Sequence, residues 1–324
     1  MTAHAVNPAA AGDLVMTERA VAQPKVLHSR IADYQELFKV RVTSMVVLTA
    51  WAGFYLGSMR SGITSIHWGL LESLLGITLI SCGASVLNQV IERKTDAKMV
   101  RTAQRPVAAG RFSLAAGMAL GLACFAAGAL VLAWFTNPVT VMLTLLTGFI
   151  YVAVYTPLKR YTTLATFIGA FPGAMPPLLG WTAARGVIEW PAVALFAILF
   201  VWQFPHFMAI AWLYREDYAK AGIRMLPVMQ PDGWSTACEA LIYAVVMIPV
   251  SVVPFYLHLA GRAYLVTAVV LGLVYLAYTV RFARITRALS VTESRRYARE
   301  LLRASVIHLP LLLTVMMLNA TGRR

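Results

Sequence analysis

Long apolar runs alternate with short polar segments along nearly the whole chain. Each run approaches the ~20 residues that a helix needs to cross the hydrocarbon core of a bilayer. The runs are rich in Leu, Val, Ala and Gly, without the alternation that is typical of barrel strands. The pattern predicts an all-α membrane protein, a bundle of nine transmembrane helices around a cavity open to the cytoplasm. The predicted spans are residues 42–59, 68–91, 113–135, 138–157, 162–183, 191–213, 239–260, 263–280 and 301–320.

The two ends of the chain are predicted to lie outside this bundle. Residues 1–33 are interpreted as a disordered tail, residues 34–320 as the transmembrane domain, and residues 321–324 as a short tail on the opposite side. The composition agrees, since 59% of the residues are hydrophobic and 13% are charged. A soluble domain has about 25% charged residues. The composition therefore excludes a soluble globular domain as well as a disordered chain.

Positive charge is concentrated between alternate spans. Of the 28 Lys and Arg residues, 23 lie before the first predicted span, in residues 1–41, and in segments 92–112, 158–161, 214–238 and 281–303. The positive-inside rule places these segments in the cytoplasm, together with the N-terminus, and the C-terminus on the outer side. This topology and anionic lipid account for the net charge of +14. We therefore expect the lipid bilayer, and no nucleic acid, as a partner.

A carboxylate and amide pattern follows the second predicted span. Asn88, Glu92 and Asp96 are spaced at i, i+4 and i+8, which places them on one face of a helix that continues the span. Oxygen ligands of this kind suit a hard divalent cation. Mg²⁺ typically takes one or two carboxylates and completes its shell with water and substrate phosphate. The pattern indicates a magnesium site at the cytoplasmic edge.

Cationic side chains accompany this pattern. Arg101 and Arg105 follow Asp96, and Tyr155, Lys159 and Arg160 end the fourth span on the same side. Cations beside metal-binding carboxylates are what a diphosphate site requires. The alternative is a solvated helix end, in which the acids pair with neighbouring cations and the basic residues anchor the loops to lipid. The spacing alone does not decide between these readings.

A second acidic segment follows span six in the same way. Glu216 and Asp217 stand at a cytoplasmic helix exit, close to Lys220. The repetition suggests two metal-binding arms that face one another across a cavity. His206 precedes Asp217 by eleven residues, which places it roughly 16 Å deeper in the membrane at ~1.5 Å per residue. It is either a functional residue or a neutral His bonded to a neighbouring helix.

The fifth span carries an unusual number of prolines. Pro172, Pro176 and Pro177 fall within six positions and are expected to break or kink the helix. Irregular backbone at this depth is tolerated only against protein or a cavity. The segment is therefore expected to line the interior.

In combination, these motifs resemble the UbiA family of membrane prenyltransferases, and within it the members that farnesylate heme. The resemblance covers residues 34–320. The matching stretches are Asn88-xxx-Glu92-xxx-Asp96-xx-Met99-x-Arg101-Thr102-xx-Arg105-Pro106, Tyr155-Thr-Pro-Leu-Lys159-Arg160, Pro172-Gly-Ala-x-Pro176-Pro-x-x-Gly180-Trp181, Trp202-Gln-x-Pro-His206-Phe and Asp217-Tyr218-xx-Ala-Gly222-xx-Met225-Leu-Pro227, with Lys39-x-Arg41 before the first span.

The chain departs from the general family pattern at both acidic segments. Glu92 stands where many members have Asp, and its longer side chain still supplies a carboxylate. Tyr214 and Tyr218 stand where members with aromatic substrates have the two acids of a DxxxD motif. This exchange makes a symmetric metal site uncertain, and Asp217, with Glu216, is the candidate for the second arm.

The resemblance implies a reaction. Farnesyl diphosphate binds with Mg²⁺, and its farnesyl group and water add to a vinyl group of heme b, which gives heme O and diphosphate. It also implies the inner membrane of a bacterium, and heme A synthase or oxidase assembly factors as possible partners. The residues expected to act in catalysis are Asn88, Glu92, Asp96, Asp217 and Lys159, of which all except Lys159 hold the metal. Those expected to bind substrate are Arg101, Arg105, Tyr155, Arg160, His206, Glu216 and Lys220.

Three other functions are compatible with parts of the sequence. A UbiA-type transferase could use an aromatic or quinone-precursor acceptor, although the two tyrosines and the stretch Trp202–Phe207 argue against it. A transporter would favour acids near the middle of the membrane, whereas here they gather at one face. An assembly factor that only binds heme would release no diphosphate.

Overall fold

The computed structural model describes residues 29–62 and 68–321. These residues form helices with one isolated β-bridge, between Ala260 and Ala320. The helices are α1 (Arg30–Leu37), α2 (Val40–Arg60), α3 (Trp68–Asp96), α4 (Leu114–Phe135), α5 (Pro138–Phe149), the π-helix η1 (Ile150–Tyr155), α6 (Thr156–Leu158), α7 (Ala165–Arg185), α8 (Trp190–Leu213), α9 (Arg215–Lys220), α10 (Leu226–Met229), α11 (Trp234–Tyr256), α12 (Arg262–Ala283), the 3₁₀ helix η2 (Arg284–Arg287) and α13 (Val291–Leu318).

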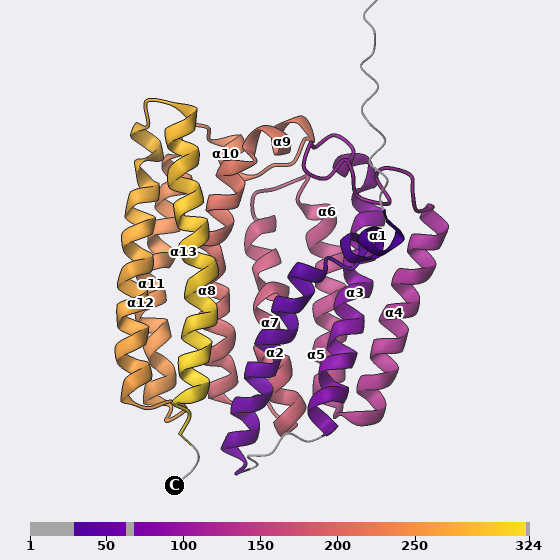
Figure 1. Ribbon diagram of the computed structural model, residues 1–324, viewed down its shortest axis with the longest axis vertical. Helices are drawn as coiled ribbons and strands as arrows, with labels where there is room; N and C mark the ends of the chain where they lie inside the picture. Colours follow the sequence, from indigo (N-terminus) through magenta and orange to yellow (C-terminus); the bar gives the residue numbers. More distant parts are fainter. Residues whose placement is uncertain (1–28, 63–67, 322–324) are drawn as a thin grey trace, which may run out of the picture.

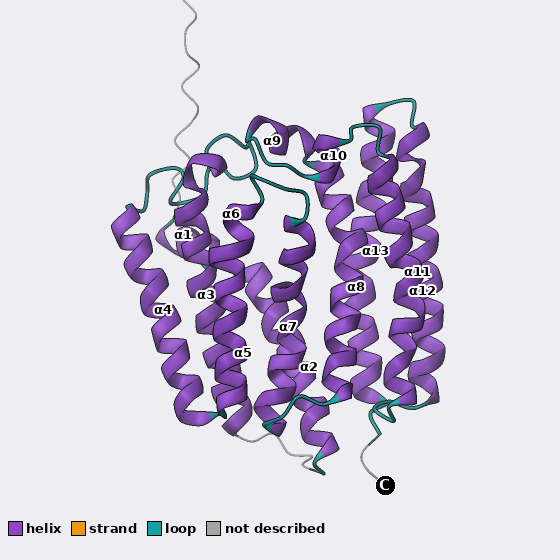
Figure 2. Ribbon diagram, turned by 180° about the vertical axis from the view of Figure 1, so that it is seen from behind, coloured by secondary structure: helices purple, strands orange, loops and turns teal. Residues whose placement is uncertain are grey.

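The long helices run side by side as one bundle (Figure 1). α3, α4 and α5 form one flank, α8, α11, α12 and α13 form the other, and α2 and α7 lie between them. The short helices α1, α9 and α10 gather at one end of the bundle, and the described chain ends at the opposite end (Figure 2). This end carries the basic segments that the sequence analysis predicts to lie in the cytoplasm.

Eight described helical segments are long and apolar enough to cross a membrane. They include the continuous stretch Pro138–Leu158, in which α5, η1 and α6 follow one another. The predicted span 162–183 corresponds to α7, which is as long as α2 but contains three prolines and three glycines and is not one of these eight segments. The all-helical membrane fold is thus confirmed, with eight strongly apolar helices and α7 packed among them.

The three prolines do not end α7, which is continuous from Ala165 to Arg185, so the expected break is wrong. The surrounding helices stabilise this segment. Gln203 of α8 donates a hydrogen bond to the carbonyl oxygen of Ala170 at 2.8 Å. α2 packs against the far half of α7 so closely that a Cβ at Gly180 would collide with the backbone of Ala50. The expectation that this helix faces the interior agrees with its burial.

Some described helical residues lie outside the predicted spans. α13 begins at Val291, where Ser290 accepts a hydrogen bond from the backbone N–H of Glu293 as an N-cap. Its first turns are polar and therefore give no apolar signal. α1 begins at Arg30, so residues 30–33, which the sequence places in the tail, are helical. Residues 1–28 and 322–324 lie outside the described part of the chain.

Candidate functional site

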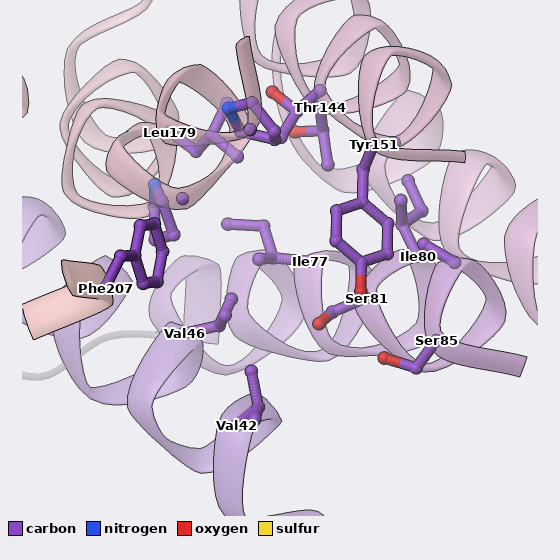
Figure 3. Close-up of a pocket in the computed structure, with 17 residues that line it drawn as sticks. Val42, Val46, Ile77, Ile80, Ser81, Ser85, Thr144, Tyr151, Leu179 and Phe207 are labelled. Carbon is purple, nitrogen blue, oxygen red and sulfur yellow. The ribbon is translucent and has the colours of Figure 1, made fainter. Parts of the chain in front are cut away.

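A cavity of about 840 Å³, including the open space at its mouth, lies between α2, α3, α5, η1, α7 and α8 (Figure 3). Its walls are mostly apolar, and the hydroxyl groups that it contains come from serine, threonine and Tyr151. The α3 wall includes Ile77, Ser81 and Ser85, which recur at helical spacing. Asn88 is the next residue on the same face of α3. The predicted metal-binding motif therefore continues the cavity wall toward the end of the bundle that carries α9 and α10 (Figure 1).

The three side chains of this motif are buried together at the end of α3. Asn88 and Asp96 are 1% exposed and Glu92 is 6% exposed. Asn88 Nδ2 donates to Glu92 Oε2 at 2.9 Å and to the Thr156 hydroxyl at 3.0 Å. The helix continues through Asp96, as the sequence predicts. We call Asn88, Glu92 and Asp96 the first arm.

Each member of the first arm is paired with a cation. Lys39 Nζ donates to Asn88 Oδ1 at 2.5 Å, and Lys159 Nζ lies 2.7 Å from Glu92 Oε1. Arg105 Nη1 donates to both Asp96 oxygens at 2.9 Å. The cations come from three places in the chain: the start of α2, the loop after α3 and the end of α6. Their convergence forms a positive pocket around the oxygen ligands.

Electrostatic shifts follow from this crowding. Burial, together with the charges of Arg105 and Lys159, lowers the pKa of Lys39 to about 7. Burial alone would also lower the pKa of Lys159, but Tyr155 and Glu92 raise it above its usual value. Lys159 is therefore a permanent cation, whereas Lys39 is held close to its titration point. The Lys39 backbone is also in the left-handed region, with φ of 46°.

The π-helix η1 positions two aromatic side chains beside these cations. The Tyr151 hydroxyl lies 3.2 Å from Lys39 Nζ, and the Lys159 ammonium lies 4.7 Å from the centre of the Tyr155 ring. The two tyrosine rings are 5.6 Å apart. A π-helical turn carries one extra residue, and such turns are frequent at functional sites. Tyr151 of this π-helix lines the cavity, as Figure 3 shows.

The remaining predicted cations lie at the edge of the pocket. Arg160 donates a hydrogen bond to the Thr95 hydroxyl, one residue before Asp96. The Arg101 guanidinium lies 5.0 Å from the centre of the Tyr214 ring and is exposed. Lys220, at the end of α9, is also exposed. Arg101 is thus close to the second segment, whereas Arg160 is anchored to the first arm.

The second acidic segment does not meet the first arm through its acids. Glu216 pairs with Arg295 of α13 at 3.1 Å, and Asp217 lines a separate pocket with Arg295 and Arg299. The contacts toward the first arm come from the tyrosines: Tyr214 lies under Arg101, and Tyr218 packs in one cluster with Met99. Among the described residues, no three His, Cys, Asp or Glu side chains are grouped to hold a metal ion. The expected pair of facing acidic arms is therefore not present.

His206 is hydrogen-bonded to Ser305 of α13. Its Nδ1 lies 2.8 Å from the Ser305 hydroxyl oxygen, and that oxygen lies 2.7 Å from the Leu302 carbonyl oxygen. When the Ser305 hydroxyl donates to Leu302, the matching His206 tautomer donates from Nδ1 and leaves a lone pair on Nε2. The ring stacks on Trp202, whose indole N–H donates to the Ser305 carbonyl at 3.0 Å. The next residue, Phe207, lines the cavity.

Comparison with known proteins decides the family. The model of the UbiA prenyltransferase family matches residues 46–299. The chain belongs to the UbiA prenyltransferase family. The protoheme IX farnesyltransferase of Koribacter versatilis is 52% identical to it over 302 residues, which are 93% of this chain and 97% of that protein. The protoheme IX farnesyltransferase of Solibacter usitatus is 42% identical, over 90% of this chain and 99% of that protein.

Solved structures share the UbiA fold. A digeranylgeranylglyceryl phosphate synthase aligns with a TM-score of 0.71 at 16% identity, over 89% of this chain and 98% of that chain. A UbiA homologue from Archaeoglobus fulgidus bound to GPP and Mg²⁺ aligns with a TM-score of 0.56 at 15% identity, over 86% and 99%. At these identities the likeness concerns the fold.

The first arm of this UbiA protein has the chemistry of a magnesium site. It offers two carboxylates and an amide oxygen, all hard ligands, and Mg²⁺ leaves the rest of its shell to water and phosphate. The sequence analysis assigns no role to Lys39, which lies in the matching motif Lys39-x-Arg41. A lysine just outside a predicted span is typical of a residue that anchors a helix to the membrane surface, so its position does not indicate a role in a site.

Proposed function

We propose that this chain transfers the farnesyl group of farnesyl diphosphate, with addition of water, to a vinyl group of heme b. The products are heme O and diphosphate. The observation that carries the proposal is the 52% identity, along 93% of the chain, to a protein named protoheme IX farnesyltransferase. The apolar cavity that opens beside the first arm and its cations supports it, because such a substrate has an apolar tail and a diphosphate head.

In this proposal the diphosphate lies at the first arm. Asn88, Glu92 and Asp96 would hold Mg²⁺, which neutralises charge on the leaving diphosphate when it is bound. Arg105 and Lys159 already stand at those carboxylates and would turn to phosphate oxygens. Lys39, Arg101 and Arg160 would complete the cationic lining. Asp217 is not required as a metal ligand here, since its pocket is shared with arginines of α13.

The farnesyl tail would extend along the apolar cavity, with Tyr155 and Tyr151 close to its reactive end. The C1–O bond breaks and the electron pair leaves with the diphosphate. The allylic cation then adds to the terminal carbon of the vinyl group, and water adds to the carbon beside the porphyrin ring and loses a proton. The aromatic rings favour a nearby cation. The apolar walls limit early capture of the allylic cation by water.

His206 is proposed to face heme b. With Nδ1–H donated to Ser305, the Nε2 atom offers a lone pair and no proton. That state suits an axial ligand to iron and does not suit a hydrogen-bond donor to a propionate. Metal-ligating histidines commonly donate their other ring N–H in this way. An axial role is therefore favoured over pairing with a propionate.

The membrane placement completes the proposal. The eight apolar helices make this a multi-pass membrane protein. We propose the bacterial cytoplasmic membrane, with the N-terminus in the cytoplasm and the C-terminus in the periplasm, because 23 of 28 basic residues lie on one side. Heme A synthase and oxidase assembly factors remain proposed partners through the family resemblance.

The proposal is tested with purified protein in liposomes supplied with heme b, farnesyl diphosphate and Mg²⁺. We expect a product whose mass exceeds that of heme b by a farnesyl group plus water, and stoichiometric diphosphate release. An Asp96→Asn variant serves as the matched control. Heme binding without diphosphate release would refute the proposal. Prenylation of 4-hydroxybenzoate but not of heme, or substrate flux across the liposome without covalent change, would refute it as well.

A further inference from the structure

The cavity has a floor at a defined depth below the first arm. Along α3 its deepest lining residue is Ile77, and along α7 it is Leu179. Each is 2% exposed, and both belong to one packed cluster. Figure 3 shows the Ile77 side chain pointing into the cavity and Leu179 at its rim. Together they separate the open space from the packed outer half of the bundle.

The bundle closes behind this floor. At the depth of Leu179, α2 and α7 touch through their backbones, since a Cβ on Gly53 would collide with the Pro177 carbonyl. About one turn further, the Thr140 hydroxyl donates to the Thr182 hydroxyl at 3.0 Å, and both residues are fully buried. An apolar chain would have to disrupt this polar pair to pass. The cavity thus ends at Ile77 and Leu179.

The depth of the floor matches one prenyl length. Asn88 lies eleven residues from Ile77 along α3, a rise of about 16 Å. An extended farnesyl chain with C–C bonds of ~1.5 Å spans roughly 14 Å. A chain one isoprene unit longer would run into the floor, and one unit shorter would leave apolar space unfilled. We propose that Ile77 and Leu179 set the length of the prenyl group that this enzyme accepts. This inference rests on the proposed function and names its specificity-determining residues.

The test compares prenyl diphosphates of three lengths, geranyl, farnesyl and geranylgeranyl, in kcat/KM with heme b. We expect Ile77→Ala and Leu179→Ala each to raise the geranylgeranyl-to-farnesyl ratio at least tenfold, because a small side chain opens the floor. Ile77→Phe should lower farnesyl use more than geranyl use. Ile80→Ala is the matched control, since Ile80 lines the side of the cavity one turn nearer the mouth. Its effect should be similar for all three lengths.

A binding measurement separates this inference from the reaction itself. Thermal stabilisation of each variant by farnesyl and geranylgeranyl thiolodiphosphates with Mg²⁺ reports chain-length preference without any acceptor. If heme b is not prenylated but Ile77→Ala still shifts this preference, the proposed function is refuted. The assignment of Ile77 to the cavity floor is then still supported. If Ile77→Ala and Ile80→Ala shift the preference equally, or neither does, the floor assignment is wrong.

Discussion

Replacing Lys39 with Met should stabilise the ligand-free protein and lower its affinity for diphosphate. The charges of Arg105 and Lys159 act on the Lys39 ammonium and lower its pKa, in addition to burial. Its pKa falls from 10.5 to about 7, which corresponds to at most roughly 5 kcal/mol of cost for the charged form. The side chain is half-buried and keeps a hydrogen bond to Asn88. We therefore expect about a third of that figure, near 1.5 kcal/mol, to appear in a measurement.

The sign of the pH dependence follows from linkage. A lysine with a depressed folded pKa releases its proton more readily in the folded protein than in the unfolded one. The unfavourable contribution of the charged lysine to the free energy of folding is present in full below pH 7. It disappears as the pH rises toward 10.5. The wild type should thus become more stable between pH 6 and 9 by this contribution, and Lys39→Met should lack it. At pH 6 the variant should melt about 3 °C higher.

The assay is thermal unfolding in detergent at pH 6 and pH 9, with and without magnesium diphosphate. Lys39→Met should gain less stabilisation from the ligand than wild type does, since a cation has been removed from the pocket. Arg41→Met is the control, because Arg41 is exposed and lies two residues away. The reasoning would be refuted if the melting temperature of Lys39→Met changed with pH as much as that of wild type. A melting temperature of Lys39→Met below that of wild type at pH 6 would refute it as well.

Three further substitutions probe the site. Asp96→Ala should abolish turnover while the protein remains folded in detergent. Its Tm should be lower, because Arg105 loses both of its 2.9 Å hydrogen bonds. Full activity of this variant at ordinary Mg²⁺ would overturn the metal assignment. Lys159→Met should leave Glu92 buried without its 2.7 Å partner and lower kcat/KM for farnesyl diphosphate 100-fold or more, which steady-state kinetics would check. Ser305→Ala should lower heme-dependent turnover about tenfold to 100-fold and alter the absorption spectrum of bound heme, whereas magnesium diphosphate affinity stays at its wild-type value; an unaltered spectrum would argue against an oriented His206.

The sequence predicts the parts of this molecule that depend on local periodicity. The run 68–91 and the spacing of Asn88, Glu92 and Asp96 define one continuous helix, and the structure has it. The first turns of α13 are not predicted from the sequence, because they are polar and their apolar face is too narrow to give a hydropathy signal. The prolines of α7 mislead because tertiary contacts such as Gln203 to Ala170 support a helix that local propensity disfavours.

The site is predictable in composition and less so in geometry. The sequence predicts Arg105 and Lys159 as site cations but not Lys39. Which member of the first arm each cation contacts depends on segments that meet only in the folded bundle. Asp217 and Tyr218 are neighbours in α9 and therefore point to different sides of the helix. Asp217 lines a pocket with Arg295 and Arg299, whereas Tyr218 packs in one cluster with Met99. Lys39 owes its place to a left-handed backbone turn between α1 and α2 that periodicity does not report.

If the first arm holds Mg²⁺, the pairing of each of its ligands with a cation couples metal binding to diphosphate binding. Mg²⁺ would displace Lys39, Lys159 and Arg105 from their acceptors. Diphosphate would supply the oxygens that these cations then need, so each ligand would raise the affinity for the other by the same factor. We therefore expect the protein to bind Mg²⁺ more weakly alone than together with diphosphate.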